Sequence, residues 1–244
     1  MNPVRKESVL KLESAKKPSF IEIDVESSKQ KQSRKSTFPI VGIGVSAGSL
    51  EGLRILLKAL PSRTGMAFVL VQDLDPVNDV LLPTTLSKDI GMPVSEVAGR
   101  TTIHPNSVYI INPEVNVALA SGVLHVVTRG LSTKPSMPID RFFRTLANDR
   151  GPSAIGVLLA DKGNDGTDGL EAIHAAGGIT FARASARSSE MPKQLIESGY
   201  VDFVLPPEHM ASELMRIKEH VQIQATAFFR DAALLEALKK ALSS

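Results

Sequence analysis

Residues Val41–Gly52 read VGIGVSAGSLEG, and this stretch contains two signatures at once. Counted from Gly42 it is G-x-G-x-x-A, a turn that binds a dinucleotide between a strand and a helix. Counted from Gly44 it is G-x-S-x-G, a nucleophile elbow that presents Ser46 for covalent chemistry. Both signatures need a strand that ends here and a helix that follows. They therefore predict the same local fold and two different functions.

The sequence around this stretch alternates between short β-type runs and amphipathic helical segments. The predicted strands are PIVGIGV, AFVLVQ, VYIIN, AIGVLLA, ITFAR and DFVLP. The segments SLEGLRILLKALP and IDRFFRTLAND each place their large apolar side chains on one helical face. This alternation predicts the α/β class, with a doubly wound, mostly parallel sheet in a Rossmann-like three-layer arrangement. Residues 108–127, with a turn at ASG, predict a small antiparallel insertion of two or three strands.

The composition narrows the classes of protein and site to consider. The chain has 244 residues, 43% hydrophobic and 22% charged, which suits one main globular domain with tails. It has no cysteine, so disulfides, thiolate metal sites and cysteine nucleophiles are excluded, and a cytoplasmic location is expected. The five histidines lack zinc-ligand spacing, and no apolar run is long enough to span a membrane. We therefore expect no metal, no cofactor, no membrane insertion and no nucleic-acid partner.

Composition also predicts three parts of the chain. Residues 1–36 hold nine Lys/Arg against five Asp/Glu and few apolar side chains, so they are expected to form a disordered basic tail. Residues 37–218 contain the strand and helix pattern and form the predicted domain. Residues 219–244, which include QATAFFRDAALLEALKKAL, are predicted to be a helical C-terminal tail.

Ligands of doubly wound sheets bind outside the carboxyl ends of the strands. Three turns at such positions are chemically unusual: GVSAGS, QDLDP and ADKGNDGTDG. The last of them packs three acids and a lysine into a glycine-rich turn that opens a helix. Its simplest interpretation is helix capping, with Asp165 or Thr167 as the N-cap residue.

The third turn separates the two signatures of the opening stretch. In a dinucleotide site Asp73, at the end of the second strand, would hold the ribose hydroxyls. That site leaves no task for the turn that carries Asp165. A nucleophile elbow needs small residues two positions before and after the serine, and Gly44 and Gly48 meet that requirement. The elbow is therefore the favoured interpretation.

With the third turn included, five segments resemble the catalytic domain of the chemotaxis-type protein-glutamate methylesterases, the CheB-like family. GIGVSAGSLEGL resembles the family's G-x-S-[TA]-G-G segment, VLVQDLDP its strand ending in V-x-Q-H-x-x-P, and LLADKGNDGTDGL its glycine-rich aspartate turn. PIDRFFRTLA and EMPKQLIESGYVDFVLPPEHMASEL resemble two further segments. The resemblance implies a Ser-His-Asp hydrolase that cleaves glutamate methyl esters and releases methanol. It implies a methyl-accepting chemoreceptor, or a related signalling protein, as the partner.

Carried over by position, the resemblance makes Ser46 the nucleophile and Asp165 the acid of the triad. It expects a histidine base at position 73, where this chain has Asp73. The residues expected to line the site or its oxyanion region are Ala47, Gly48, Lys162 and Gly163. A second departure is Ser49, which stands where the family usually has glycine. The C-terminal tail resembles a fragment of the CheR-like methyltransferase of some fusions, which implies a truncated or remodelled fusion; an amphipathic docking helix is the alternative.

The missing histidine changes the expected mechanism. An aspartate, with an ordinary pKa of ~3.9, is a much weaker base than a histidine at ~6.5. Asp73 next to Asp165 would raise the pKa of one of the two by like-charge repulsion. Lys162 cannot easily replace the base, because the acids beside it keep it charged. We expect an impaired methylesterase, with a non-catalytic signalling scaffold for a receptor or kinase partner as the alternative and a dinucleotide-binding protein as the least favoured.

Overall fold

The computed structural model describes residues 38–73, 83–127, 137–160, 164–184, 197–218 and 220–221. The chain divides into two units, residues 1–34 and residues 35–244, and all the described residues belong to the second. The predicted tails therefore lie outside the described residues, apart from 220–221.

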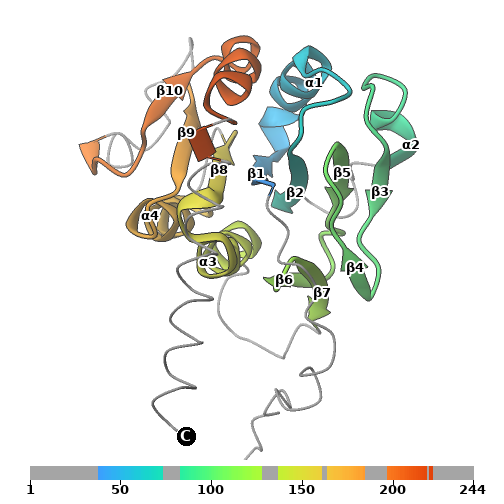
Figure 1. Ribbon diagram of the computed structural model, residues 1–244, viewed down its shortest axis with the longest axis horizontal. Helices are drawn as coiled ribbons and strands as arrows, with labels where there is room; N and C mark the ends of the chain where they lie inside the picture. The colour runs from blue at the N-terminus through green and yellow to red at the C-terminus, as the bar shows by residue number, and fades with distance from the viewer. Residues whose placement is uncertain are drawn as a thin grey trace, which may run out of the picture. The chain divides into compact units, whose positions relative to one another are not determined.

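A parallel sheet is the centre of the fold (Figure 1). Among the described residues it has seven strands in the order β10-β9-β8-β1-β2-β5-β3, and every pair is parallel. The strands are β1 Ile40–Ser46, β2 Ala67–Asp73, β3 Val94–Glu96, β5 Ser107–Ile110, β8 Ala154–Leu158, β9 Ile179–Arg183 and β10 Phe203–Leu205. The order continues from β1 to β2 on one side and to β8 on the other, so the switch point lies at β1. The predicted doubly wound, mostly parallel sheet is confirmed.

Helices cover both faces of this sheet. Their bounds are α1 Leu50–Ala59, α2 Pro83–Leu86, α3 Pro138–Arg150 and α4 Thr167–Ala175, with short 3-10 turns η2 Ala47–Ser49 and η3 Gly151–Ser153. Residues 207–218 are also helical. In Figure 1, α1 lies on the opposite side of the strands from α3 and α4. The predicted three-layer arrangement is thus present.

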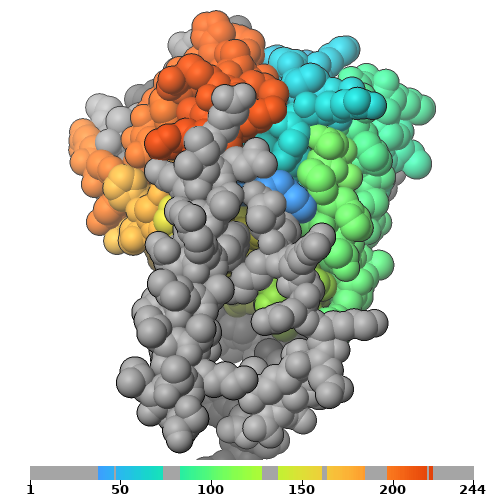
Figure 2. Space-filling model, in the orientation of Figure 1, coloured from blue at the N-terminus to red at the C-terminus, as the bar shows by residue number. Residues whose placement is uncertain are grey.

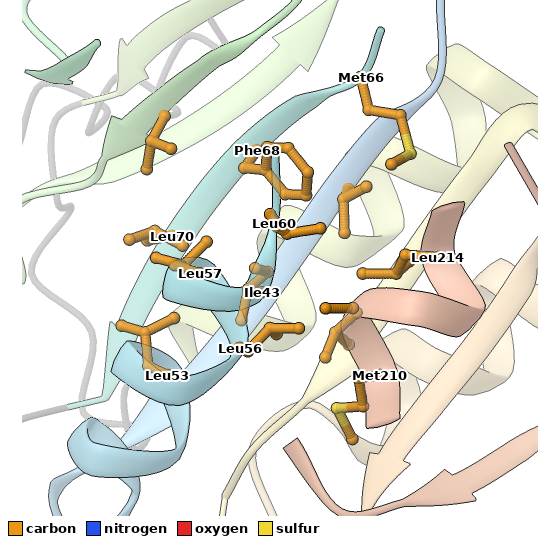
Figure 3. Close-up of a cluster of buried hydrophobic side chains, with 14 of the residues drawn as sticks. Ile43, Leu53, Leu56, Leu57, Leu60, Met66, Phe68, Leu70, Met210 and Leu214 are labelled. Atoms are coloured by element: carbon orange, nitrogen blue, oxygen red, sulfur yellow. The ribbon is translucent and has the colours of Figure 1, made fainter. Parts of the chain in front are cut away.

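The alternation of side chains along β1 explains the two layers of core. Val41, Ile43 and Val45 pack with α1 and the helix of residues 207–218. Figure 3 shows this core, to which α1 contributes Leu53 and Leu56 and the second helix contributes Met210 and Leu214. The space-filling view also places α1 (cyan) next to this helix (orange-red) (Figure 2).

The other core lies between the sheet, α3 and α4. Its members include Ile40 of β1 together with apolar residues of both helices: Ile139, Phe142, Phe143, Leu146, Leu170 and Ile173. Gly42 and Gly44 face this helix layer. A Cβ atom on Gly42 would lie 2.9 Å from Leu146 Cδ2, and one on Gly44 would lie 2.5 Å from Ile139 Cγ2. Glycine at these positions therefore lets α3 approach the backbone of β1.

The antiparallel insertion is confirmed, with two differences: its third strand lies at residues 100–102, before the predicted range, and the first predicted strand belongs to the main sheet. Its described strands are β4 Arg100–Thr102, β6 Asn116–Ala120 and β7 Val123–Val127, in the order β4-β7-β6. The predicted ASG turn connects β6 to β7 through Ser121 and Gly122, with φ angles of 51° and 74°. The first strand of the predicted insertion is β5, which belongs to the main sheet. β6 packs along α3, as Figure 1 also shows.

No helix within the described residues is both long and apolar enough to cross a membrane.

Candidate active site

The topology brings Ser46, Asp73 and Asp165 to the carboxyl edge of the sheet. Ser46 is the last residue of β1 and Asp73 the last residue of β2, and the strand register pairs them directly. Asp165 follows β8, which pairs with β1 on its other side, and precedes α4. Paired residues on adjacent parallel strands lie about 5 Å apart. The described residues of the three predicted turns thus lie at the switch point around β1.

Ser46 reaches this edge on an unstrained backbone. Its φ and ψ angles are −104° and 168°, an ordinary extended conformation. Among the described residues other than glycine, only Asn106 and Ser121 have positive φ angles. The serine is therefore presented, without backbone strain, by the end of a strand that runs into η2. Gly44 is needed for the packing of Ile139, as described above.

A second hydroxyl lies next to that of Ser46. The Oγ atoms of Ser46 and Ser49 are 3.2 Å apart. Ser49 is completely buried, whereas Ser46 is partly buried. Gly48 between them is exposed. Sequence reasoning noted Ser49 as a departure from the family pattern but gave it no place in the site.

Asp165 is held in place by the N-terminus of a neighbouring helix. Its Oδ2 accepts the backbone N–H of Ile139 and its Oδ1 accepts that of Asp140, both at 3.0 Å. These N–H groups belong to the first turn of α3, where intrahelical partners are lacking. The carboxylate of Asp165 therefore caps α3 and is also favoured by the positive end of that helix.

Asp140, in turn, accepts backbone N–H groups at the start of the other helix, α4. Its Oδ1 accepts the N–H of Gly166 at 2.9 Å and that of Gly169 at 2.7 Å, both at the N-terminus of α4. The N-cap residue of α4 is Gly166, with a φ angle of 99°. The capping interpretation of the turn is thus partly right: Asp165 caps a helix, but it caps α3, and α4 is capped from α3. Sequence reasoning missed Asp140, because the pairing joins residues 25 positions apart.

Burial and neighbouring charges raise the pKa of Asp165 to about 6. Burial is the largest cause, and the two N–H bonds from Asp140 and Ile139 act against it. The negative charges of Asp140 and then Asp73 add smaller increases in the pKa. The expected repulsion between Asp73 and Asp165 therefore exists, but it is the smallest of these effects. The pKa of Asp140 is also raised, mainly by burial.

The structure describes only some of the other residues of the predicted site. Lys162 and Gly163 lie outside the described residues, as does Asp161. Ala47 and Gly48 form η2 directly after Ser46. Gln72, which was not predicted, is buried, and its Nε2 donates to the carbonyl oxygen of Ile111 at 3.0 Å. This bond ties the end of β2 to the chain that follows β5.

Packing gives the glycines of the dinucleotide signature a structural role. No group of three or more His, Asp or Glu within the described residues could hold a metal ion. The space above Gly42 and Gly44 is filled by side chains of α3. Their lack of side chains is thus explained by packing, and the dinucleotide interpretation loses its main support.

Comparison with known proteins agrees with this geometry. The sequence pattern of the family described as CheB methylesterase matches residues 41–214. A protein-glutamate methylesterase/protein-glutamine glutaminase of Moorella thermoacetica is 30% identical over 191 residues, which are 75% of this chain and 45% of that protein. One of the corresponding Anaeromyxobacter dehalogenans proteins is 31% identical and is covered to 53%. The chain thus spans about half the length of these two relatives.

A solved structure supports the same assignment. The crystal structure of the Thermotoga maritima CheB methylesterase catalytic domain superposes with a TM-score of 0.66 at 26% sequence identity. The match covers 74% of this chain and 98% of that one. A putative enzyme of the same name as the Moorella protein, from Leptospira interrogans, is 27% identical, and 96% of its length is covered. The chain therefore belongs to the CheB methylesterase family.

Proposed function

We propose that this chain is a protein-glutamate methylesterase domain whose activity is impaired because Asp73 occupies the position of the catalytic base. Its substrate is the methyl ester of glutamate side chains on a methyl-accepting chemoreceptor or a related signalling protein. The names of the relatives support this substrate class. The observation that carries the proposal is the place of Asp73, which pairs with Ser46 and lies close enough to Asp165 to raise its pKa.

In the proposed reaction, Ser46 Oγ attacks the ester carbonyl carbon, and the proton of its hydroxyl must pass to a base. The carbonyl–methoxide bond then breaks, and the same proton converts the methoxide into methanol. Water hydrolyses the resulting acyl-serine to restore Ser46 and the glutamate. A histidine serves both proton transfers because its pKa lies near neutrality.

A carboxylate at position 73 supports neither transfer well. It accepts the serine proton weakly, so little of that proton is available to pass on to the methoxide. Both carboxylate oxygens of Asp165 accept backbone N–H groups of α3, which lower its pKa and hold it as the cap of that helix. Triads that lack one member commonly retain only ~10³ to 10⁴-fold acceleration over water. We therefore expect slow turnover from an otherwise assembled site.

The test is methanol release from a methylated receptor by the whole 244-residue chain. We expect the wild-type rate to equal that of Ser46→Ala, and Asp73→His to raise the rate by roughly 10² to 10⁴-fold, the usual contribution of a positioned base. Asp73→Asn is the matched control, because it removes the charge without supplying a base. It should stay at the Ser46→Ala rate. A wild-type rate far above that of Ser46→Ala would show that the site is competent and that the impairment is absent.

A non-catalytic signalling scaffold is the second candidate, and it is favoured by Asp73 itself. The described fold is complete without a histidine at position 73, so a receptor or kinase partner could still be bound. Isothermal titration with a methylated receptor fragment separates the two candidates. Binding by both the wild type and Asp73→His, with no methanol release from either, would support the scaffold.

A further inference from the structure

We propose that Ser49 is a positioning residue for Ser46, whose hydroxyl it holds at the carboxyl end of β1. This inference rests on the proposed role of Ser46 as the nucleophile. It concerns a hydroxyl that the family pattern usually lacks, since glycine is the common residue at this position.

The contact between the two serines is within hydrogen-bonding distance and is shielded from water on the side of Ser49. Ser49 Oγ lies 3.2 Å from Ser46 Oγ, and either hydroxyl can donate. Ser49 has no exposed surface, so its side chain cannot pair with bulk water. A buried hydroxyl nearly always has a protein or ordered-water partner. Ser46 meets that need for Ser49.

The position of Ser49 in the chain makes this pairing informative. Ser49 is the N-cap residue of α1, where a serine usually accepts an N–H of the first helical turn. Within the described residues, its side chain makes no capping hydrogen bond to α1. The hydroxyl points instead to Ser46, three residues back in the sequence. A group suited to stabilising the helix is thus directed at the proposed nucleophile.

This pairing restrains the side chain of Ser46 in a defined direction. Each hydroxyl has one proton and two lone pairs, so Ser46 can bond to Ser49 and still present a lone pair to an ester carbonyl. Productive attack needs the nucleophile held near its reacting geometry. Removal of Ser49 Oγ takes away this restraint on the choice among the staggered rotamers of Ser46. We therefore expect a lower reactivity of Ser46 when the hydroxyl at position 49 is removed.

The test measures the reactivity of Ser46 without the natural substrate. A fluorophosphonate probe modifies the serine, and intact-mass spectrometry gives the second-order rate constant. The measurement uses the whole chain with Asp73→His and, separately, the unmodified chain, with Ser46→Ala as the blank. Ser49→Ala and Ser49→Gly should each lower the rate constant about fivefold, as expected for the loss of one neutral hydrogen bond. Ser49→Thr, which keeps a hydroxyl, should stay within about twofold of its parent.

Two further readouts separate positioning from folding. Thermal unfolding of each variant reports whether the fold is intact. In the Asp73→His background, Ser49→Ala should lower kcat for methanol release and leave KM unchanged, because binding of the receptor does not need this hydroxyl. Equal rate constants for Ser49→Ala, Ser49→Gly and the parent would overturn the proposal. A Ser49→Thr rate as low as that of Ser49→Ala would also overturn it, since the hydroxyl would then not matter.

The outcomes also distinguish this inference from the proposed function. No modification of Ser46 in either background would overturn both, because there would be no nucleophile to position. A fivefold loss of labelling in Ser49→Ala, together with no methanol release from Asp73→His, would support the role of Ser49 and contradict the esterase assignment.

Discussion

At the scale of single residues, Asp165 has both a place in the candidate site and a role in folding. Its pKa is raised from the ordinary 3.8 to about 6. The folded protein therefore binds a proton at this carboxyl more tightly than the unfolded chain does. Between these two pKa values the stability must fall as the pH rises, because the unfolded state binds fewer protons.

The first prediction concerns how the free energy of unfolding depends on pH. The contribution of Asp165 to stability is complete below about pH 4 and is lost as the pH rises through about 6. The pKa difference corresponds to a change on the order of 3 kcal/mol. Asp165→Asn cannot titrate, so the stability difference between wild type and variant should change over this range. Urea unfolding at several pH values measures it, and a difference that stays constant from about pH 4 to about pH 7 would contradict the raised pKa.

The sequence predicts which three residues lie at this edge of the sheet. It does not predict their hydrogen-bond partners or the shift in the pKa of Asp165. The place of Ser46, Asp73 and Asp165 at this edge could be predicted because each lies at or after the end of a clear apolar strand. The pairing of Ser46 with Ser49 could not, because an N-cap serine ordinarily bonds to its own helix. The shift of the Asp165 pKa could not either, since burial depends on the packing of α3 and α4.

At the scale of secondary-structure elements, α3 and α4 cap each other. Asp165, just before α4, accepts N–H groups of α3, and Asp140 of α3 accepts N–H groups of α4. Each helix start is therefore satisfied by a carboxylate from the other segment. This exchange fixes the turn that carries Asp165 against the sheet.

The second prediction concerns the loss of one half of this exchange. Asp140→Ala leaves the N–H groups of Gly166 and Gly169 without their acceptor in a buried region. We expect a loss of about 1 to 3 kcal/mol in the free energy of unfolding. Asp168→Ala is the matched control on the same helix pair, because Asp168 forms an exposed ion pair with Arg144. Its cost should stay below about 1 kcal/mol in urea unfolding, and equal costs for the two variants would refute the capping role of Asp140.

The third prediction concerns the contact of α3 with β1. The added methyl group in Gly44→Ala would lie 2.5 Å from Ile139 Cγ2, so the helix must shift. Overpacking of this kind costs about 1 to 3 kcal/mol. Ile139→Ala removes the opposing atoms and leaves a cavity that the new methyl group partly fills. The double variant should therefore be more stable than the sum of the single costs implies, and strictly additive costs in thermal unfolding would show that the two sites do not touch.

Strands and helices could be predicted where the segment is long enough to show a periodic pattern of apolar residues. β1 and α3 have enough residues for their periodicity to appear. β3 and β4 have three residues each and largely exposed side chains, so no pattern distinguishes them from loops. The assignment of β5 to the main sheet depends on its parallel register with β2, which is a long-range contact.

At the scale of the whole molecule, β1 connects the two cores. Its residues alternate between the core under α1 and the core under α3 and α4. The fourth prediction is that both cores unfold together. Leu56→Ala in the first core and Phe143→Ala in the second should each cost about 2 to 5 kcal/mol.

If the two cores unfold together, different probes of unfolding should report the same transition. Unfolding followed by circular dichroism and by tyrosine fluorescence should give one midpoint for each variant, since the chain has no tryptophan. Tyr109 belongs to the second core and reports on it directly. Two separate midpoints in either variant would show that the cores are independent.

The exchange of caps between α3 and α4 also bears on how such a site is inherited. Asp165 is buried and holds a helix start, so its replacement costs the fold even when no ester is cleaved. Asp73 is exposed at the end of a strand, where the fold tolerates many side chains. If the site has lost its activity, as proposed above, selection for folding alone would preserve Asp165 but not the residue at position 73. An aspartate at position 165 is therefore not by itself evidence of catalysis.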